Sequence, residues 1–310
     1  MSKRFELRPI KPEERFEVAE LIYLSLNHWH QTHGRSAIFH DGPRIAEVFY
    51  DTYQELTPDH NVIAVHPETQ RIMGSCFYHP REHHVSLGVM TVHPNYFGHG
   101  VGRALVDYII DFTEQNNYPA LRLVSSAINL DSFSLYNRAG FVPRCFYQDM
   151  IIPVPGDGFP HSVPEAKRVR AATLDDVSAM AALEMDISGI QREMDYRYCI
   201  ENRAGYWNVM VYEGDQGIDG FLISSSHLAM RVLGPCLART AKEALALLCR
   251  GLDLYRGQTP VLIPPGEETE LVSTLYSWGA KNVELHLCSV RGQFQPFRGI
   301  SMPTFLPETG

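Results

Sequence analysis

The chain has 310 residues, 45% of them hydrophobic and 20% charged, with a formal net charge of -9 at pH 7. This length predicts two domains, each large enough to bury a core. The acidic balance disfavours nucleic acid as a partner, and no apolar stretch reaches the roughly 20 residues needed to cross a bilayer, so no membrane partner is expected. The six cysteines form no Cys-x-x-Cys pair or metal-binding spacing, and Met1 to Arg4 lead directly into a polar strand, which together predict a reduced, cytoplasmic protein without a metal.

Hydrophobic periodicity in the first half predicts a mixed α/β fold. A period near 3.6 indicates helices, and short apolar runs bounded by turn residues indicate strands. The turn-like segment 66–69 lies between two such strands and predicts an antiparallel hairpin. Helices are expected over residues 12–27, 43–56, 101–117 and 130–139, and strands over 5–9, 61–65, 73–78, 84–92, 120–127 and 141–153.

Residues 153–166 are rich in proline and glycine, so they predict a linker through which neither a helix nor a central strand can run. The second half then repeats the order of the first, which predicts two similar domains in tandem, residues 1–152 and 167–293. The tail, residues 294–310, is expected to pack across the domain seam or to pair with a neighbouring chain, which leaves a homodimer open. In the second half, strands are expected over 167–172, 207–212 and 217–224, and helices over 173–184 and 241–252.

Three glycines separate a strand-like run from a helix-like run in the sequence V-H-P-N-Y-F-G-H-G-V-G-R-A-L, residues 92–105. Glycine permits a tight turn and a close approach of backbone to a ligand, and the first amides of the following helix have no acceptor within it. Together with the helix dipole, these amides favour an anion such as a phosphate. A nucleotide triphosphate loop fails because no Lys-Ser/Thr pair follows Gly102, and a dinucleotide fingerprint is weak because Arg103 stands where a third glycine is needed.

A second motif, N-L-D-S-F-S-L-Y-N-R-A-G-F, follows at residues 129–141. With the glycine loop, it resembles the GNAT superfamily of acyl-CoA dependent N-acetyltransferases, and the resemblance covers residues 4 to about 152. It implies a mostly antiparallel central sheet with flanking helices, and acetyl-CoA as co-substrate. The family usually carries Arg or Gln where this chain has Phe97, which leaves backbone amides and Arg103 to meet the pyrophosphate.

The resemblance assigns acetyl-CoA contacts to three parts of the chain. The strand before the loop is expected to bond the pantetheine arm and to polarise the thioester carbonyl through the backbone of Met90, Thr91 and Val92. Asn129 is expected either to bond the pantetheine or to cap a helix. The pyrophosphate is expected to contact Gly98, His99, Gly100, Val101, Gly102 and Arg103.

Two side chains are candidates for catalysis. Tyr136 stands where family members place a tyrosine that hydrogen-bonds the departing sulfur, and a core tyrosine is the alternative. His84 lies about where the protein-lysine branch of the family carries a glutamate base, and an imidazole has a suitable pKa for the role. Glu82 and His83 compete with His84, and an uninvolved surface histidine is also open.

The second half lacks glycine between Pro235 and Leu245, so it is expected to be a degenerate copy without an acyl-CoA site, although Arg239 and Lys242 could offer cations to a phosphate. In the first half, the aromatic stretch of residues 28–53 is expected to form the acceptor-side wall or ordinary core packing.

The sequence therefore predicts an acetyl-CoA dependent N-acetyltransferase that moves an acetyl group to a primary amine of a small molecule or peptide by direct attack. A catalytically silent acyl-CoA binding or sensing protein is the alternative from another class. A different acyl group or a hydroxyl acceptor also remains open.

Overall fold

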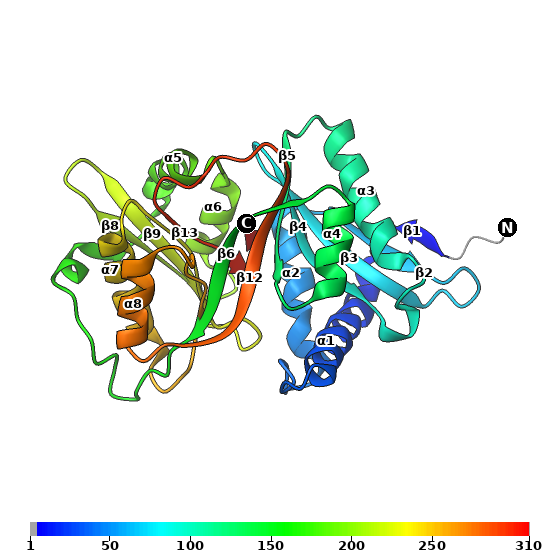
Figure 1. Ribbon diagram of the computed structural model, residues 1–310, viewed down its shortest axis with the longest axis horizontal. Helices are drawn as coiled ribbons and strands as arrows, with labels where there is room; N and C mark the ends of the chain where they lie inside the picture. Colours follow the sequence, from blue (N-terminus) through cyan, green and yellow to red (C-terminus); the bar gives the residue numbers. More distant parts are fainter. Residues whose placement is uncertain (1–4, 310) are drawn as a thin grey trace.

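Helices and strands alternate along residues 5–309, the part of the chain that the computed structural model describes (Figure 1). The strands are β1 (Glu6–Arg8), β2 (Asn61–Val65), β3 (Ile72–Pro80), β4 (Val85–Val92), β5 (Ala120–Ser126), β6 (Val142–Ile151), β7 (Val169–Ala171), β8 (Trp207–Glu213), β9 (Ile218–Ser225), β10 (Val232–Ala238), β11 (Val261–Leu262), β12 (Lys281–Gly292), β13 (Ile300–Met302), β14 (Thr304–Phe305) and β15 (Glu308–Thr309). The α-helices are α1 (Arg15–Thr32), α2 (Glu47–Leu56), α3 (Val101–Gln115), α4 (Leu130–Arg138), α5 (Val177–Ser188), α6 (Glu193–Glu201), α7 (Ala241–Leu252) and α8 (Thr269–Ser277). Short 3-10 turns are η1 (Pro12–Glu14), η2 (Pro43–Ala46), η3 (Pro94–Tyr96), η4 (Pro164–Arg168), η5 (Leu174–Asp176) and η6 (Asp253–Tyr255).

One sheet extends through both halves of the described chain. Its strand order is β1-β2-β3-β4-β5-β12-β6-β11-β10-β9-β8-β7, with β13 beside β10, while β14 and β15 form a separate hairpin. Most neighbours are antiparallel, and the parallel pairs are β4 with β5 and β10 with β11. This arrangement confirms the predicted mixed α/β class with a mostly antiparallel sheet and flanking helices.

The N-terminal part of the sheet carries helices on both faces. α1 and α2 pack on one face around a core that includes Ile22, Tyr53 and Phe77. α3 and α4 cover the other face, where α3 buries Leu105 and Ile109, one helical turn apart. The two faces therefore have separate apolar cores, and the sheet lies between them (Figure 1).

The two halves exchange strands at the centre of the sheet. β12 comes from the second half but lies between β5 and β6 of the first, with Val290 opposite both Arg122 and Val142. β11 in turn pairs with β6, where Leu262 lies opposite Met150. The predicted segments 1–152 and 167–293 therefore do not enclose complete sheets, because β6 and β12 belong to both halves in space.

Several elements differ from the sequence expectations, and most of the second half beyond residue 252 was not predicted. Residues 141–153 contain one long strand, β6, and the predicted linker 153–166 runs into η4. α6 lies where no element was predicted. Its buried side chains are Asp195, Tyr196 and Cys199, so a charged residue interrupts the apolar pattern that would have revealed a helix.

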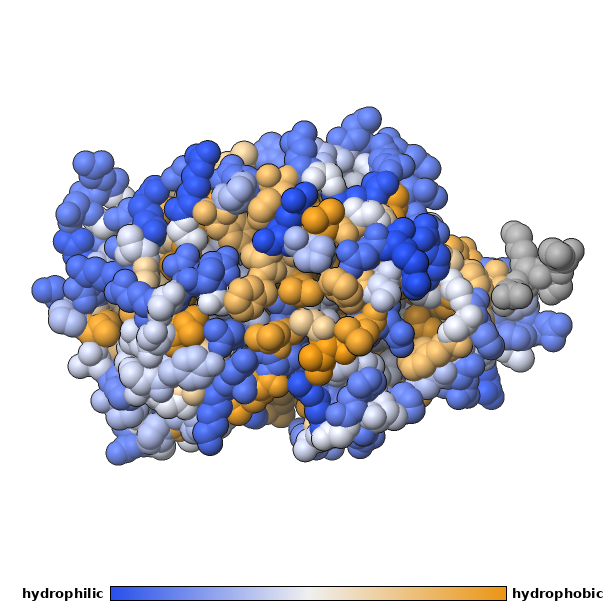
Figure 2. All heavy atoms as spheres, in the orientation of Figure 1, coloured by the Kyte–Doolittle hydropathy of each residue, from blue (hydrophilic) through white to orange (hydrophobic). Residues whose placement is uncertain are grey.

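Apolar side chains gather in the middle of one face, between the two halves (Figure 2). β6 and β12 expose Val142, Phe146, Val283 and Leu285. Within residues 5–309, no helix combines the length and the apolar character that spanning a membrane requires.

Because β6 and β12 are shared, cutting the connection between the halves should leave them associated. A protease site inserted between the exposed residues Gly156 and Asp157 makes this testable. After cleavage, the two fragments should co-elute on size-exclusion chromatography and separate only in denaturant, since the backbone ladders of β12 with β5 and β6 would otherwise lose their partners. Elution as two separate folded fragments would contradict the exchange, and the uncut insertion variant is the control.

Candidate active site

The parallel strands β4 and β5 separate well before β4 ends. They pair at Val85 with Leu121 and at Ser86 with Arg122, and β4 then continues to Val92 without pairing to β5. Backbone groups along the separated edges have no ladder partner on that side, and such groups need another partner when they are buried. We call this region the β4–β5 separation.

A β-bulge in β4 helps to place the separation. Gly88 and Val89 together lie opposite the single residue Phe77 of β3. The Tyr53 hydroxyl, from α2, accepts a hydrogen bond from the Val89 amide at 3.2 Å. A Cβ atom on Gly88 would lie 3.0 Å from the Tyr53 ring, so glycine is what allows the tyrosine to approach the strand.

The predicted pantetheine contacts follow this bulge on β4. Thr91 is buried, and its hydroxyl shares a hydrogen bond of 3.0 Å with Ser75 on β3. The Val92 carbonyl accepts a hydrogen bond of 3.1 Å from the Ser25 hydroxyl on α1. Met90 is half-buried and packs against the core beneath α3. Contacts from these residues to pantetheine remain a prediction.

The glycine loop leads directly into α3. Gly98 and Gly100 have φ of 77° and 85°, a left-handed conformation that favours glycine, and a Cβ atom at either would meet nothing within 4 Å. The amide of Ala104 bonds to the Gly100 carbonyl at 3.1 Å. The amides of Val101, Gly102 and Arg103 precede that bond, so they have no acceptor in the ladder of the helix and are available to an anion.

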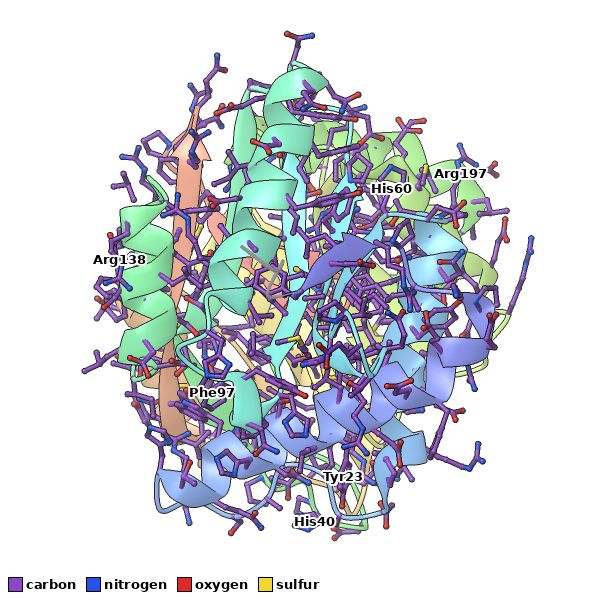
Figure 3. All side chains as sticks on the ribbon, turned by 90° about the vertical axis from the view of Figure 1, so that its right-hand side faces the viewer. Tyr23, His40, His60, Phe97, Arg138 and Arg197 are labelled. Carbon is purple, nitrogen blue, oxygen red and sulfur yellow. The ribbon has the colours of Figure 1, made fainter. Side chains whose placement is uncertain are left out.

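Several side chains around the loop have partners within the protein. Phe97 is 53% exposed, and its ring centroid lies 6.4 Å from that of His28. The Arg103 Nε donates to Asp107 one turn along α3 at 2.8 Å, and Arg138 projects from α4 (Figure 3). The Asn129 side chain accepts a hydrogen bond of 3.1 Å from the Ser132 amide, so it caps α4. The cofactor roles of Arg103 and Asn129 remain predictions.

Tyr136 lies on α4 and is buried, in the core between that helix, α3 and the sheet. Burial raises the pKa of its hydroxyl well above the ordinary value, and the nearby Cys76 and Glu308 raise it further. A phenol in this environment stays protonated at neutral pH. It can therefore donate a hydrogen bond but is a poor source of a full proton.

The structure does not favour His84 as the base. His84 is buried and directly precedes Val85, where β4 and β5 are paired. It therefore lies on the closed side of the β4–β5 separation, at the end where the two strands are still joined. Its Nε2 lies 3.1 Å from the Ser86 hydroxyl. Burial lowers the pKa of His84 well below its usual value, and Arg122 and Arg81 lower it further, so its protonated form is strongly disfavoured. Of its two competitors, Glu82 accepts a hydrogen bond of 3.3 Å from the Glu193 amide.

The second half contains an equivalent pair of parallel strands, but its own tail fills the space between them. β10 pairs with β11 only at Val232 and Leu233. Farther along, β13 pairs with β10 in antiparallel fashion, with Cys236 opposite Met302. Arg239 forms salt bridges with Asp186 and Asp219, and Lys242 forms one with Glu165. The absence of an acyl-CoA site from the second half stays a prediction.

Glu308 is a residue that the sequence analysis did not single out. It lies on β15, and its Oε2 accepts a hydrogen bond of 3.0 Å from the Tyr53 hydroxyl. β15 contacts both β4 and β5, so the end of the tail lies at the β4–β5 separation. No local motif marks Glu308. Tyr53, by contrast, belongs to the aromatic stretch of residues 28–53, and it is 1% exposed in the core beneath α1 and α2.

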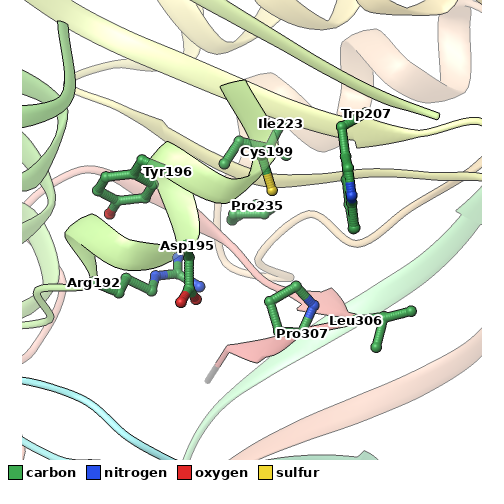
Figure 4. Close-up of a pocket in the computed structure, with 9 residues that line it drawn as sticks. All are labelled: Arg192, Asp195, Tyr196, Cys199, Trp207, Ile223, Pro235, Leu306 and Pro307. Carbon is green, nitrogen blue, oxygen red and sulfur yellow. The ribbon is translucent and has the colours of Figure 1, made fainter. Parts of the chain in front are cut away.

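Buried ion pairs hold the seam beside the tail. Arg81, between β3 and β4, donates to Asp195 of α6 at 2.8 Å, and both side chains are almost fully buried. Arg192 forms a second buried pair with Glu184 of α5. Figure 4 shows Arg192 and Asp195 in the wall of a small cavity whose other side includes Pro307 of the tail. The seam therefore fixes α6 against both the first half and the tail.

The buried imidazoles predict a pH dependence of stability. Burial lowers the pKa of His79 and His84 well below the usual value, so both are neutral in the folded chain, whereas in the unfolded chain they titrate near 6.5. As pH falls through about 6.5, the unfolded state binds more protons than the folded state, and the free energy of unfolding decreases by up to about 1.4 kcal/mol per pH unit for each histidine. Urea unfolding at several pH values measures this slope.

The variant His84→Gln should lower that slope by about one proton. His40→Gln, at an exposed position, is the matched control and should leave the slope unchanged. An equal slope in His84→Gln and the parent chain would show that His84 is not held neutral.

Comparison with known families and structures agrees with this geometry. The family model described as acetyltransferase (GNAT) family matches residues 23–141. Mycothiol acetyltransferase of Jonesia denitrificans is 30% identical over 118 residues, 37% of this chain and 36% of its own length. A Bacillus subtilis protein, UPF0157 protein YqkA, is 28% identical over 88 residues. The chain thus spans only 25% and 36% of the lengths of the curated relatives it matches.

Solved structures resemble the whole described fold. A candidate acetyltransferase from Pyrococcus horikoshii has a TM-score of 0.74 at 13% identity, over 96% of this chain and 92% of that one. A tandem GNAT protein from the clavulanic acid biosynthesis pathway has a TM-score of 0.60 at 12% identity, over 93% of this chain and 98% of that one. Residues 23–141 thus match the GNAT family model, and the fold of the described chain resembles that of a tandem GNAT protein.

Proposed function

We propose that the protein is an acetyl-CoA dependent N-acetyltransferase whose N-terminal half carries the active site. The observation that carries this proposal is the β4–β5 separation, with the amides at the start of α3 available to an anion. In this proposal the pyrophosphate lies against Gly98 to Arg103, and the pantetheine arm lies along Met90 to Val92. The similarity to mycothiol acetyltransferase supports the acetyl group as the one transferred.

The reaction proceeds by direct attack of a neutral amine nitrogen on the thioester carbonyl. Backbone amides of β4 polarise that carbonyl, and such preorganised donors stabilise the charge that develops on its oxygen. The buried Tyr136 hydroxyl then donates a hydrogen bond to the departing sulfur. No covalent intermediate on the protein is required. The acceptor is a primary amine of a small molecule or a peptide.

A second candidate is a silent acyl-CoA binding or sensing protein. One observation favours it: the position where the family usually places Arg or Gln carries the exposed Phe97, and Arg103 is paired with Asp107. The two candidates differ in one measurable property. A sensor binds acetyl-CoA without releasing the thiol of CoA when amines are added.

Binding should depend on the left-handed glycines of the loop. Gly100→Val is expected to weaken acetyl-CoA binding about tenfold or more in calorimetry, because the side chain blocks the close approach of the phosphates to the amides. Gly257 is the matched control, since it also has a left-handed φ, 72°, and open space around a Cβ atom. Gly257→Val therefore carries the same backbone strain in the other half. Equal affinity in both variants would contradict the loop assignment.

Turnover should depend on Tyr136. Release of CoA thiol is followed with acetyl-CoA and tyramine, glucosamine, spermidine or a peptide with a free N-terminus. Tyr136→Phe is expected to lower kcat about tenfold or more with a smaller change in the KM for acetyl-CoA, because the hydrogen bond to the sulfur forms as the bond breaks. Tyr108→Phe on α3 is the matched control. Thiol release that Tyr136→Phe leaves unchanged would remove the role, and no release with any amine would favour the sensor.

A further inference from the structure

The tail connects the two halves at their corresponding strand separations. β13 pairs with β10 in the second half, and the hairpin of β14 and β15 follows after Pro303. β15 contacts β4 and β5, so one continuous segment fills the separation of the second half and then reaches that of the first (Figure 1).

Glu308 is held at the β4–β5 separation by a short chain of hydrogen bonds. Its Oε2 accepts from the Tyr53 hydroxyl at 3.0 Å, and that hydroxyl accepts from the Val89 amide of the bulge at 3.2 Å. The Tyr53 ring is itself fixed, because it stacks on Phe77 with 4.8 Å between ring centroids. The carboxylate is therefore tied to the strand whose backbone borders the proposed thioester site.

Glu308 interacts with residues from both faces of the sheet. Tyr53 belongs to the core beneath α1 and α2, whereas Tyr136 belongs to the core beneath α3 and α4. Glu308 bonds to Tyr53, and its charge also acts on Cys76 and Tyr136. Glu308 thus lies between α1 and α2, which would border an acceptor, and α4, which carries Tyr136, the proposed hydrogen-bond partner of the CoA sulfur.

The environment of Glu308 is unusual for a structural carboxylate. Among residues 5–309, no arginine, lysine or histidine forms a salt bridge with it, yet protein surrounds it on most sides. The residue as a whole nevertheless keeps partial solvent exposure. Burial raises the pKa of Glu308 well above the usual range for a carboxyl group, which brings it closer to that of an alkyl ammonium group.

We propose that Glu308, delivered by the C-terminal hairpin, is the general base that deprotonates the acceptor amine. The inference rests on the proposed acetyl transfer. The Glu308 carboxylate takes one proton from the ammonium group, and the freed nitrogen lone pair forms the N–C bond with the thioester carbon. The C–S bond then breaks, and the second proton of the nitrogen passes to the CoA thiolate while Tyr136 donates a hydrogen bond to the sulfur. The Glu308 carboxyl group returns its proton to solvent.

The test is the pH profile of Glu308→Gln with the same amines and acetyl-CoA. At pH 7, kcat is expected to fall about 100-fold or more, with little change in acetyl-CoA affinity by calorimetry. Because the variant depends on amine that has already lost its proton, its rate should rise about tenfold per pH unit up to the pKa of the amine. The rate of the parent enzyme should instead level off once the pH exceeds the pKa of Glu308. In Glu308→Ala, added formate should restore part of the activity, which a merely structural role would not allow.

Controls and the parent chain separate the possible failures. Glu270→Gln, at an exposed carboxylate on α8, should leave the profile unchanged. Absence of thiol release by the parent chain with all four amines would contradict the proposed function and the base together. If the parent chain releases thiol and Glu308→Gln has the same pH profile as the parent, the role of Glu308 as the base is contradicted, but the proposed function is not. The same conclusion follows if His84→Gln loses the plateau and Glu308→Gln keeps it. Equal thermal unfolding of Glu308→Gln and the parent chain excludes misfolding as the cause.

Discussion

The parting of β4 from β5 after Ser86 is the constraint on which the rest of the site depends. Two parallel strands that separate inside a protein leave backbone donors and acceptors without ladder partners, and these must be satisfied in another way. In the first half, the Val89 amide in the bulge donates a hydrogen bond to the Tyr53 hydroxyl. The rest of the β4 edge borders the proposed co-substrate site. In the second half, the same problem is solved internally, because β13 adds a strand to β10. The two halves thus start from one architecture and differ in what completes it.

This difference explains why a half that has no glycine between Pro235 and Leu245 is still needed. The second half supplies β12, which lies between β5 and β6, and its tail supplies the hairpin at the β4–β5 separation. Without β12, the strand that follows the proposed pantetheine region would be an exposed edge, and such edges are unstable or prone to aggregate. The second half therefore supports the site of the first through backbone pairing and does not require a ligand of its own to do so.

The sequence predicts best those features that are local. The glycine loop, the helix after it and the motif around Tyr136 each fit within about a dozen residues, because turn chemistry and helical periodicity act over that range. β12 and Glu308 lie far from their partners in sequence, so neither could be placed without the fold. His84 shows a different limit. Counting back from the loop places it at the start of the expected strand 84–92, but only the pairing at Val85 reveals that it lies on the closed side of the separation.

The seam gives the tail its position. Two charges buried together gain little net stability, since the loss of hydration offsets much of their attraction, but an unmatched arrangement costs several kcal/mol. Arg81 and Asp195 come from opposite halves, so their pairing at 2.8 Å disfavours any docking in which the halves are shifted. Pro307 lies against the same cavity as Asp195, and Glu308 follows it directly. A buried ion pair outside the proposed site thus restricts where the carboxylate of the tail can lie. A one-residue shift of the hairpin would move Glu308 away from Tyr53.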